Sequence, residues 1–350
     1  MRSKRAGILI GRILLVLGIT LLLAVIAVTG ILWVILRGPS RNAQELLTRS
    51  MKETSAVGFI PELFLSKERV AEIMREKDEP EQEARPVDVS LVTVRAVRGD
   101  SAPDEVPVAL ESGEAGEPEY FSSDGITLVP ITGASYQGML MIVDDPFRVF
   151  VGTPDHFGTV GLTLRQMVKK YDAVAGINAG GFYDPGGSGN GGTPEGIVIA
   201  DGKLTWGNAG TNSSVIGFDS DGVLHVGMMS GREAQNRNIQ WACSFGPALV
   251  VNGEAVSSNQ ISTSGVNPRT AIGQRADGAV LLLVVDGRQI TSMGATLEDL
   301  IAILLEHGAV NAANLDGGSS TQMIYDGETL NKNASVIGER PLPTTFLVRR

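Results

Sequence analysis

The sequence is poor in the residue types that build disulfide frameworks and metal centres. It has one cysteine, Cys243, and three histidines in 350 residues. A single cysteine excludes an intrachain disulfide framework and a multi-cysteine metal site. Cys243 lies in the apolar segment 239–245, which favours a buried small hydrophobic residue over a nucleophile. The histidines, His156, His225 and His307, lie far apart, and this argues against a histidine-based zinc site.

The chain also lacks an excess of positive charge. Its formal net charge is -10, which argues against a nucleic-acid-binding surface because such surfaces carry basic stripes. Residues 101–119 contain six acidic residues and no Lys or Arg. With its Pro, Gly and Ser content, this segment is typical of a solvated linker, and a binding role for the acidic segment is the less favoured alternative.

One long hydrophobic run is present. Residues 13–36 form an uncharged apolar stretch of 24 residues, long enough to cross a bilayer as a helix. The flanking cations are Arg2, Lys4, Arg5 and Arg12 before the run, and Arg37 and Arg41 after it. This bias favours a cytoplasmic N-terminus. Because the best cleavage-site candidate, residues 25–27, is weak, we expect an uncleaved single-pass anchor in the cell membrane with everything after residue 37 outside the cytoplasm.

The rest of the chain divides by composition. We expect a cytoplasmic tail (1–12), the anchor (13–36), a helical stalk (37–80), an acidic linker (81–124) and one folded domain (125–350). In the stalk, helices are predicted over 42–51 and 65–74, with Ser66 as N-cap of the second. From residue 125 onward, strand-like segments alternate with Asp-Gly turns at 201–202, 221–222 and 277–278, which favour hairpins.

Residues 279–285 are continuously apolar and predict a central strand. Helices are expected near 163–171, 230–239 and 296–307. The fold class is therefore α+β, a single mixed-sheet, hairpin-rich domain with a few helices, preceded by a transmembrane helix and a helical stalk.

The most informative turn follows the predicted buried strand 309–315. Asp316 ends that strand, and Gly317, Gly318, Ser319 and Ser320 come next. A carboxylate beside backbone with almost no side chains lets a ligand approach the main chain closely. The competing interpretation is that Asp-Gly-Gly is an ordinary tight turn.

Three further loops carry polar groups at or near the ends of predicted strands. The first contains Asn178, Gly180, Gly181 and Phe182, the second contains Asn267 and Arg269, and the third contains Asp286 and Arg288. The glycine-rich continuation of the first loop, 185–192, lacks the Gly-Lys-Ser/Thr and the helix of a nucleotide phosphate loop, so a flexible surface loop is its competing interpretation. A guanidinium binds phosphate or carboxylate bidentately, which lysine cannot do. The alternatives are an internal ion pair for Arg269 and another plain Asp-Gly turn at 286–287.

Four stretches in this order resemble the phosphodiester glycosidase family, the domain found in the mannose 6-phosphate uncovering enzyme (N-acetylglucosamine-1-phosphodiester alpha-N-acetylglucosaminidase). They are Gly-Ile-Asn-Ala-Gly-Gly-Phe-Tyr at 176–183, Asn-Pro-Arg-Thr-Ala-Ile-Gly at 267–273, Asp-Gly-Arg at 286–288 and Asn-Leu-Asp-Gly-Gly-Ser-Ser at 314–320. The resemblance covers roughly 125–350. Two positions depart from the family pattern: Tyr183 stands where a second Phe is common, and Ser319 where a third Gly often lies.

The resemblance implies hydrolysis of a sugar-1-phosphodiester, and it links bacterial members to cell-surface polymers and exopolysaccharide. The departing phosphate is a good leaving group, so the site needs a phosphate-binding group and a carboxylate at the anomeric centre more than a strong general acid. We assign Asp316 as the first choice for nucleophile or base and Arg269 to the phosphate, with Arg288 and the amides of 317–320 assisting. Asp286 is the second carboxylate or the group that orients Arg269.

We expect Asn178, Gly180, Gly181, Phe182 and Asn267 to complete the substrate site. The roles of Asp286 and Asp316 are interchangeable at this stage.

Several alternatives stay open. The domain could bind an envelope glycan without turnover, or serve in envelope assembly. Cleavage of the phosphorus–oxygen bond is disfavoured because such sites often use two metals held by carboxylates and histidines. No cofactor is required by the sequence, and a single calcium held by Asp side chains and backbone carbonyls stays open. The expected partners are a sugar-phosphate or cell-surface glycan and the membrane, with no nucleic acid.

Overall fold

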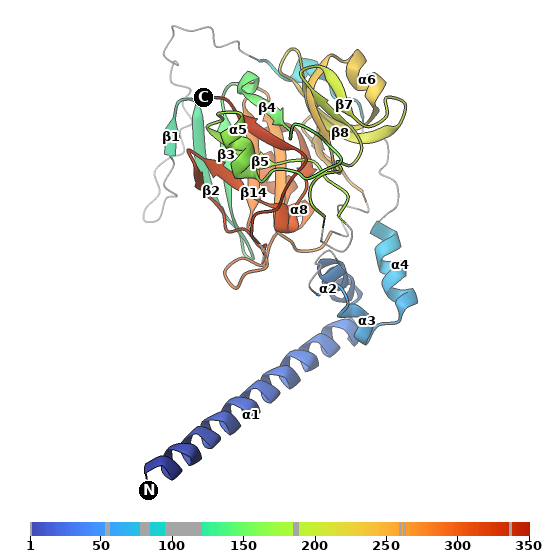
Figure 1. Ribbon diagram of the computed structural model, residues 1–350. Helices are drawn as coiled ribbons and strands as arrows, with labels where there is room; N and C mark the ends of the chain where they lie inside the picture. Colours follow the sequence, from blue (N-terminus) through green and yellow to red (C-terminus); the bar gives the residue numbers. More distant parts are fainter. Residues whose placement is uncertain are drawn as a thin grey trace, which may run out of the picture. The chain divides into compact units, whose positions relative to one another are not determined.

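The computed structural model describes residues 2–52, 57–77, 85–94, 121–184, 189–258, 261, 264–335 and 338–350. The chain divides into two compact units, Met1–Glu76 and Lys77–Arg350. Figure 1 shows the α-helical first unit in blue and the mainly β second unit in green to red.

The first unit is a long helix followed by three short ones. They are α1 (Arg2–Arg37), α2 (Arg41–Lys52), α3 (Pro61–Phe64) and α4 (Lys67–Lys77). Within α1, Gly11–Arg37 is long and apolar enough to cross a membrane. The predicted stalk helices correspond to α2 and α4. Ser66 caps α4 as expected, because its hydroxyl accepts from the backbone N–H of Arg69 at 3.2 Å.

The second unit is built around an eight-stranded antiparallel sheet. Its spatial order is β1 (Phe121–Ser123), β2 (Ile126–Thr132), β3 (Gln137–Val143), β14 (Val280–Val285), β13 (Arg269–Arg275), β15 (Ala309–Leu315), β11 (Ala248–Val251) and β12 (Glu254–Ala255). The helix α8 (Leu297–Glu306) begins with a capping box at Thr296 and precedes β15.

Strand β14 lies inside this sheet and is buried on both faces. Val280, Leu282 and Val284 belong to one core cluster, and Leu281, Leu283 and Val285 belong to a second cluster that includes the apolar face of α8. Alternate residues of a strand point to opposite faces. A strand with two buried faces therefore reads as a continuous apolar run, and the prediction of a central strand over 279–285 is confirmed.

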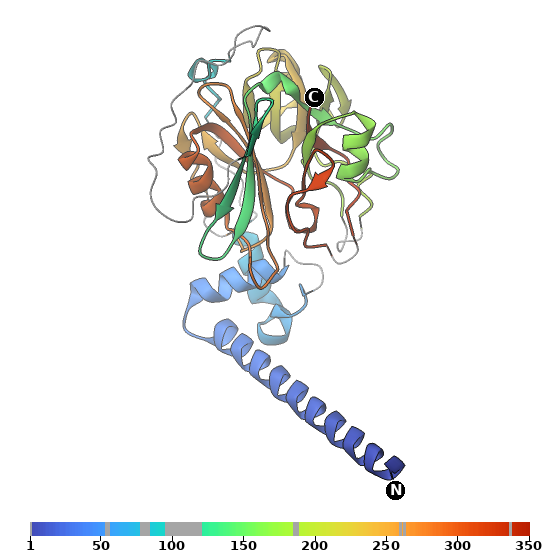
Figure 2. The ribbon, with the colours of Figure 1, turned by 90° about the vertical axis from the view of Figure 1, so that its left-hand side faces the viewer.

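Two five-stranded antiparallel sheets complete the unit. The first has the order β7 (Lys203–Trp206), β6 (Val198–Ala200), β10 (Ile239–Ser244), β8 (Asn212–Asp219) and β9 (Leu224–Ser230). The second has the order β17 (Glu328–Thr329), β16 (Met323–Tyr325), β5 (Ala175–Asn178), β18 (Thr345–Val348) and β4 (Val149–Gly152). The helices α5 (Leu164–Lys170) and α6 (Gly231–Asn236) begin at capping boxes on Thr163 and Ser230. Figure 2 shows the second unit from the side, with the strands of the large sheet near its middle.

The α+β class and the hairpins are confirmed. The strands are distributed over three antiparallel sheets, however, and not over the one mixed sheet that we expected. The reason is long-range pairing: β5 lies between β16 and β18, which follow it by about 150 residues in the chain. Such pairings leave no local pattern in the sequence.

Residues 95–120, which include most of the expected acidic linker, lie outside the described residues. The described stretch 85–94 belongs to the second unit and packs against the rest of it, where Val87 and Val92 join the core. Thr93 donates its backbone N–H to the carbonyl of Ala276 at 2.8 Å. This part of the expected linker is therefore docked on the folded unit.

Candidate active site

The predicted strand-end motifs of 178–182 and 314–320 meet at the junction of two sheets. Strand β5 ends at Asn178 in one sheet, and β15 ends at Leu315 in the other. The backbone N–H of Asp316 donates to the carbonyl of Ala179 at 2.9 Å. Two loops that are 138 residues apart in the chain are thereby joined directly after their strands.

Asn178 is the buried centre of this junction. Its side-chain N–H donates to the backbone carbonyl of Asp316 at 2.5 Å. Its side-chain oxygen accepts from the Thr270 hydroxyl at 2.9 Å and from the backbone N–H of Gln322 at 3.1 Å. These bonds satisfy the amide on both its donor and acceptor sides, so Asn178 fixes the backbone that carries Asp316.

The carboxyl group of Asp316 is poised to titrate near neutral pH. The residue as a whole is partly exposed, whereas its Oδ2 atom is buried and has no hydrogen-bond partner among the described residues. Burial raises the pKa of Asp316 to about 7, against the opposing effects of the Ser320 hydroxyl and the positive charge of Arg340. The negative charges of Glu195 and Asp184 raise this pKa further. A buried, unpartnered carboxylate oxygen is unusual in a structural turn and is typical of functional sites.

Arg340 is a site residue that the sequence analysis missed. Its guanidinium, with the residue 5% exposed, forms an ion pair with Asp184 at 2.9 Å and donates to the Ser319 hydroxyl at 3.3 Å. It also stacks over the Phe182 ring, 5.3 Å from the ring centroid. Arg340 therefore links the loop after β5 to the loop after β15 beside Asp316.

Glu195 is a second missed residue. Its backbone N–H donates to the Gly181 carbonyl at 2.9 Å, two residues beyond the carbonyl that holds Asp316. A Cβ atom on Gly181 would lie 2.6 Å from the Glu195 Oε2 atom, so this carboxylate lies directly over the glycine. Although Glu195 is exposed, partial desolvation raises the pKa of its carboxyl group. Ala179 and Gly181, whose carbonyls bind Asp316 and Glu195, are two residues apart, and two residues of chain span at most about 7 Å. One short segment therefore holds both acidic residues.

Gly180 and Gly181 are packed tightly. A Cβ atom on Gly180 would lie 2.9 Å from the Thr344 hydroxyl oxygen, and one on Gly181 would also meet the Phe245 ring at 2.7 Å. The N–H of Gly180 donates to that Thr344 hydroxyl at 2.9 Å. Only glycine lets this segment pass between its neighbours and still support the two acidic residues.

Arg288 and Asn267 adjoin the loop after β15. The Arg288 guanidinium donates to the Asn267 side-chain oxygen at 3.2 Å. Gly318 has φ +60°, and a Cβ there would lie 3.3 Å from Arg288 Nη2. Gly317 lies against the Pro268 carbonyl, which also accepts from the N–H of Gly318 at 2.8 Å. The predicted group of Asn267, Arg288, Gly317 and Gly318 is thus brought together.

Arg269 points into its own loop. Its Nε donates to the Ala295 carbonyl at 3.2 Å and its Nη2 to the Gly265 carbonyl at 2.5 Å. The residue is 8% exposed. These contacts tie together the chain segments that flank β13 and α8, and the phosphate-binding role of Arg269 stays a prediction.

Asp286 holds a different loop. Its Oδ1 accepts from the Lys332 backbone N–H at 2.9 Å and from the Asn331 side chain at 3.2 Å. Desolvation raises the pKa of this carboxyl group, and the two hydrogen bonds oppose that rise. Asp286 is not among the charges that shift the pKa of Asp316. Its role as a second carboxylate also stays a prediction.

Within the described ranges, no group of three or more His, Cys, Asp and Glu side chains is arranged to hold a metal ion. The site that the structure assembles consists of Asp316, Glu195 and Asp184 with the cations Arg340 and Arg288. Its chemistry is that of carboxylates next to guanidinium groups, which suits a substrate that carries an anion beside an electrophilic carbon.

The missed residues had weak sequence signals. Arg340 stands in Gly-Glu-Arg-Pro just before the last strand, and Glu195 stands between Pro194 and Gly196 before β6. Each is a charged residue next to a proline, with a glycine within two residues, which is a weak hint of a functional role. Neither motif, however, indicates which distant loop its side chain meets.

The part of the chain that carries this site matches the model of the phosphodiester glycosidase family. The model of that family matches residues 171–349, so the chain belongs to the phosphodiester glycosidase family, whose activity is hydrolysis of phosphodiester-linked sugars. Both strand-end loops, Glu195 and Arg340 lie within the matched residues.

Two curated proteins illustrate the relationship. The SPbeta prophage-derived uncharacterized protein YomE of Bacillus subtilis (strain 168) is 31% identical over 208 residues, which cover 56% of this chain and 31% of that protein. The N-acetylglucosamine-1-phosphodiester alpha-N-acetylglucosaminidase of Mus musculus is 26% identical over 216 residues, which cover 56% and 41%. The match thus spans well under half the length of each relative.

A solved structure has a similar fold. It is the zebrafish N-acetylglucosamine-1-phosphodiester alpha-N-acetylglucosaminidase catalytic domain auto-inhibited by pro-peptide, with a TM-score of 0.54 and 24% sequence identity. The similarity covers 68% of this chain and 85% of that one. It supports the α+β fold of the second unit.

Proposed function

We propose that this protein is a membrane-anchored, extracytoplasmic hydrolase that cleaves the glycosidic bond of a sugar-1-phosphodiester in a cell-envelope or exopolysaccharide glycan. The family match supports the reaction class. The apolar helix Gly11–Arg37 supports the anchor, and the cationic flanks of the helix support the orientation. The envelope setting follows from the proposed anchor. The acidic net charge disfavours nucleic acid as a partner.

The observation that carries this proposal is the environment of Asp316. Its Oδ2 atom is buried without a partner among the described residues, its pKa is raised to about 7, and its backbone is clamped by Asn178 and Ala179. A carboxylate with a pKa near the working pH is a good base and a competent nucleophile. We assign Asp316 to act at the anomeric carbon.

The substrate's phosphate needs cationic partners. We assign this role to Arg288, whose guanidinium lies beside Gly318, and to Arg340, which contacts Ser319. Arg340 also lowers the pKa of Asp316 and so keeps part of it ionised. The bonds that Arg269 makes to the Gly265 and Ala295 carbonyls suit it to fixing the neighbouring loop, from which it supports the phosphate site.

Glu195 is the second carboxylate of the proposed site. Its raised pKa and its position over Gly181 suit a group that holds a sugar hydroxyl or relays the proton of the attacking water. Asp286 supports the site at longer range by holding the loop at Asn331 and Lys332.

In the proposed step, the bond between the anomeric carbon and the phosphate oxygen breaks. The phosphate monoester leaves with the bonding electron pair, and an oxygen atom from water ends on the sugar. When Asp316 is the base it takes one proton from that water and later releases it to solvent. When Asp316 is the nucleophile, water hydrolyses the ester that it forms. Retention of the anomeric configuration identifies the nucleophile and inversion the base.

The test compares the full chain in detergent with its Asp316→Asn variant, using a methyl phosphodiester of N-acetylglucosamine-1-phosphate and other sugar-1-phosphodiesters. We expect turnover by the native protein and a loss of at least about 1,000-fold in kcat for the variant, with binding retained. Wild-type turnover by Asp316→Asn would refute the assignment. Binding of the diesters by the native protein without turnover would favour a glycan-binding protein.

A further inference from the structure

The short helices of the first unit cover one side of the end of α1. Along the apolar run most large side chains are about half or more exposed, for example Val34 at 61%. Leu36 is fully buried, and Leu32 and Ile35 are partly buried. The helices after α1 therefore pack against its last turns, within the apolar run itself.

The length of the run sets the level of that contact. Twenty-four helical residues extend about 36 Å, whereas the hydrocarbon core of a bilayer is about 30 Å thick. The last turn of α1 then lies at the level of the lipid headgroups. The helices that cover Leu36 are held at the same level.

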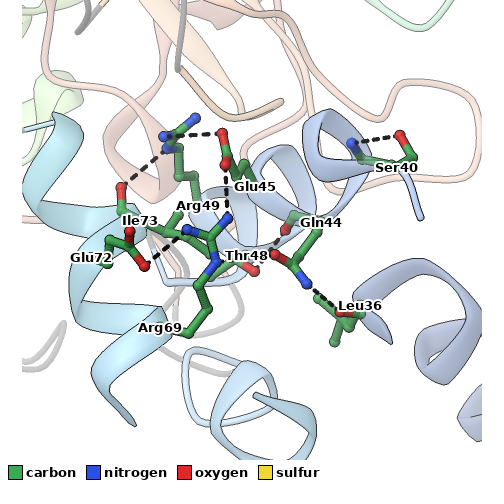
Figure 3. A network of polar contacts seen from close by, with 10 residues as sticks. Leu36, Ser40, Gln44, Glu45, Thr48, Arg49, Arg69, Glu72 and Ile73 are labelled. Atoms are coloured by element: carbon green, nitrogen blue, oxygen red, sulfur yellow. Dashed lines mark hydrogen bonds and ion pairs between the residues drawn. The ribbon is translucent and has the colours of Figure 1, made fainter. Parts of the chain in front are cut away.

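Polar contacts fix these helices to the end of α1. The Gln44 side chain donates to the Leu36 carbonyl at 2.6 Å, and Arg37 Nε donates to the Phe64 carbonyl at 2.7 Å. Figure 3 shows how Arg69 continues the network by contacting both Gln44 and Glu45. Helix α3, which ends at Phe64, is therefore within hydrogen-bond reach of the last residue of α1.

Two large apolar side chains stand exposed at this place. Phe59 is 60% exposed and Leu63 is 69% exposed. Phe59 lies in the turn before α3 and Leu63 lies within α3, four residues further along the chain. Glu62, the acidic residue next to Leu63, forms an ion pair with Lys52. This pairing lowers the cost of placing the face near anionic lipid.

We propose that Phe59 and Leu63, here called the Phe59–Leu63 face, insert into the boundary between the headgroups and acyl chains as a second membrane contact. The inference rests on the membrane-spanning role of α1 in the proposed function. The occupant is the lipid surface because α3, which carries Leu63, contacts the end of the membrane-spanning helix α1. Two cations lie close to this face, as cations flank many interfacial segments: Arg37 donates to the Phe64 carbonyl, and the charge of Lys67 acts on Glu62. Together α1 and this face attach the first unit to the membrane at two points.

The test measures the depth of nitroxide labels in the full chain, reconstituted in nanodiscs that contain anionic lipid. Labels are placed by Phe59→Cys and Leu63→Cys. Trp33→Cys serves as the control inside the span, and Phe147→Cys, 46% exposed in the second unit, serves as the aqueous control. The native Cys243 stays unlabelled because it is buried, and burial raises the pKa of its thiol far above the usual range.

We expect the labels at 59 and 63 about 5–10 Å below the lipid phosphates, the label at 33 deeper and the label at 147 in water. Adding Leu63→Glu to the Phe59→Cys protein should move the label at 59 toward water, whereas Val89→Glu, an exposed site in the second unit, should not. Aqueous labels at 59 and 63 with a buried label at 33 would overturn the inference. An aqueous label at 33 would overturn the anchor and this inference together.

Discussion

The side-chain amide of Asn178 donates a hydrogen bond to the backbone carbonyl of Asp316 at 2.5 Å. The N–H of Asp316 in turn donates to the carbonyl of Ala179 at 2.9 Å. These two bonds connect the ends of β5 and β15, which belong to different sheets. The position of the Asp316 carboxyl group therefore depends on an uncharged residue that reacts with nothing.

Replacing this amide with a carboxyl group should disable the site without changing the shape of residue 178. In Asn178→Asp, an ionised carboxylate oxygen would face the Asp316 carbonyl, because the donor is lost. We expect a loss of about 2–3 kcal/mol in the free energy of unfolding and a fall in kcat larger than any change in KM. Chemical denaturation and steady-state kinetics measure the two effects.

Asn252→Asp is the matched control, because near the surface the Asn252 side chain likewise donates to a carbonyl, that of Pro86 at 3.1 Å, and accepts from a backbone N–H, that of Asp88 at 2.7 Å. This variant should retain native kinetics. Equal losses of activity in both variants would contradict the positioning role of Asn178.

The pH dependence of the reaction should report the ionisation of Asp316. Burial raises its pKa to about 7, and only the ionised form attacks or accepts a proton. With a phosphodiester substrate that stays singly charged, kcat/KM should rise about tenfold per pH unit up to pH 7 and level off above it. A profile flat from pH 5 to 8 would contradict this account.

Two variants should move that midpoint in opposite directions. In the native protein the negative charge of Glu195 raises the pKa of Asp316 and the positive charge of Arg340 lowers it. Glu195→Gln should therefore lower this pKa, and Arg340→Gln should raise it. Glu328→Gln, a change at an exposed site in β17, should leave the midpoint where it is. Shifts of the same sign in Glu195→Gln and Arg340→Gln would show that their charges do not act on the titrating group.

Asp316 should also lower stability at alkaline pH. A carboxyl group whose pKa is raised on folding binds its proton more tightly in the folded state, so the free energy of unfolding falls as pH rises from about 4 to about 7. The upper limit is about 4 kcal/mol, and we expect about 1–2 kcal/mol because the residue is partly exposed. Asp316→Asn should therefore raise Tm by several degrees at pH 8 and hardly at all at pH 4. A lower Tm at pH 8 would mean that the carboxylate stabilises the fold.

Local features of the fold were predictable from the sequence. Strand β15 occupies the expected residues 309–315, and the Asp-Gly turn at 201–202 has positive φ at both residues, as its hairpin requires. Asp316 could be chosen because a carboxylate between a buried strand and two glycines is visible in one stretch of sequence. These features depend on neighbours within a few residues.

Features that depend on distant contacts were not predictable in the same way. Arg340 reaches Ser319 and Asp184, and Glu195 lies over Gly181, only because the loops before β18 and β6 fold back to the end of β5. Arg269 begins β13, and its guanidinium binds the Gly265 carbonyl in the preceding loop and the Ala295 carbonyl 26 residues further along the chain. The sequence shows which loop carries such a residue, but not which distant groups its side chain contacts.

Gly318 should be needed for substrate binding as well as for its turn. Its φ is +60° and Arg288 lies 3.3 Å from the position of a Cβ atom, whereas Gly327 has φ +82° and open space around that position. Alanine at either position should cost about 1–2 kcal/mol in stability because of the backbone conformation. Only Gly318→Ala should raise KM for a phosphodiester, because only there is a phosphate-binding guanidinium displaced. Equal KM values in the two variants would remove Arg288 from the proposed site.

The central claim is hydrolysis at the anomeric carbon. The most direct measurement is turnover of a sugar-1-phosphodiester by the full chain in oxygen-18 water, with the phosphate product examined by mass spectrometry. The phosphate is the informative product because the anomeric hydroxyl of a free sugar exchanges its oxygen with water. The account predicts an unlabelled phosphate monoester, since the carbon–oxygen bond breaks and the bridging oxygen leaves with phosphorus. Oxygen-18 in the phosphate would show cleavage of the phosphorus–oxygen bond and contradict the account.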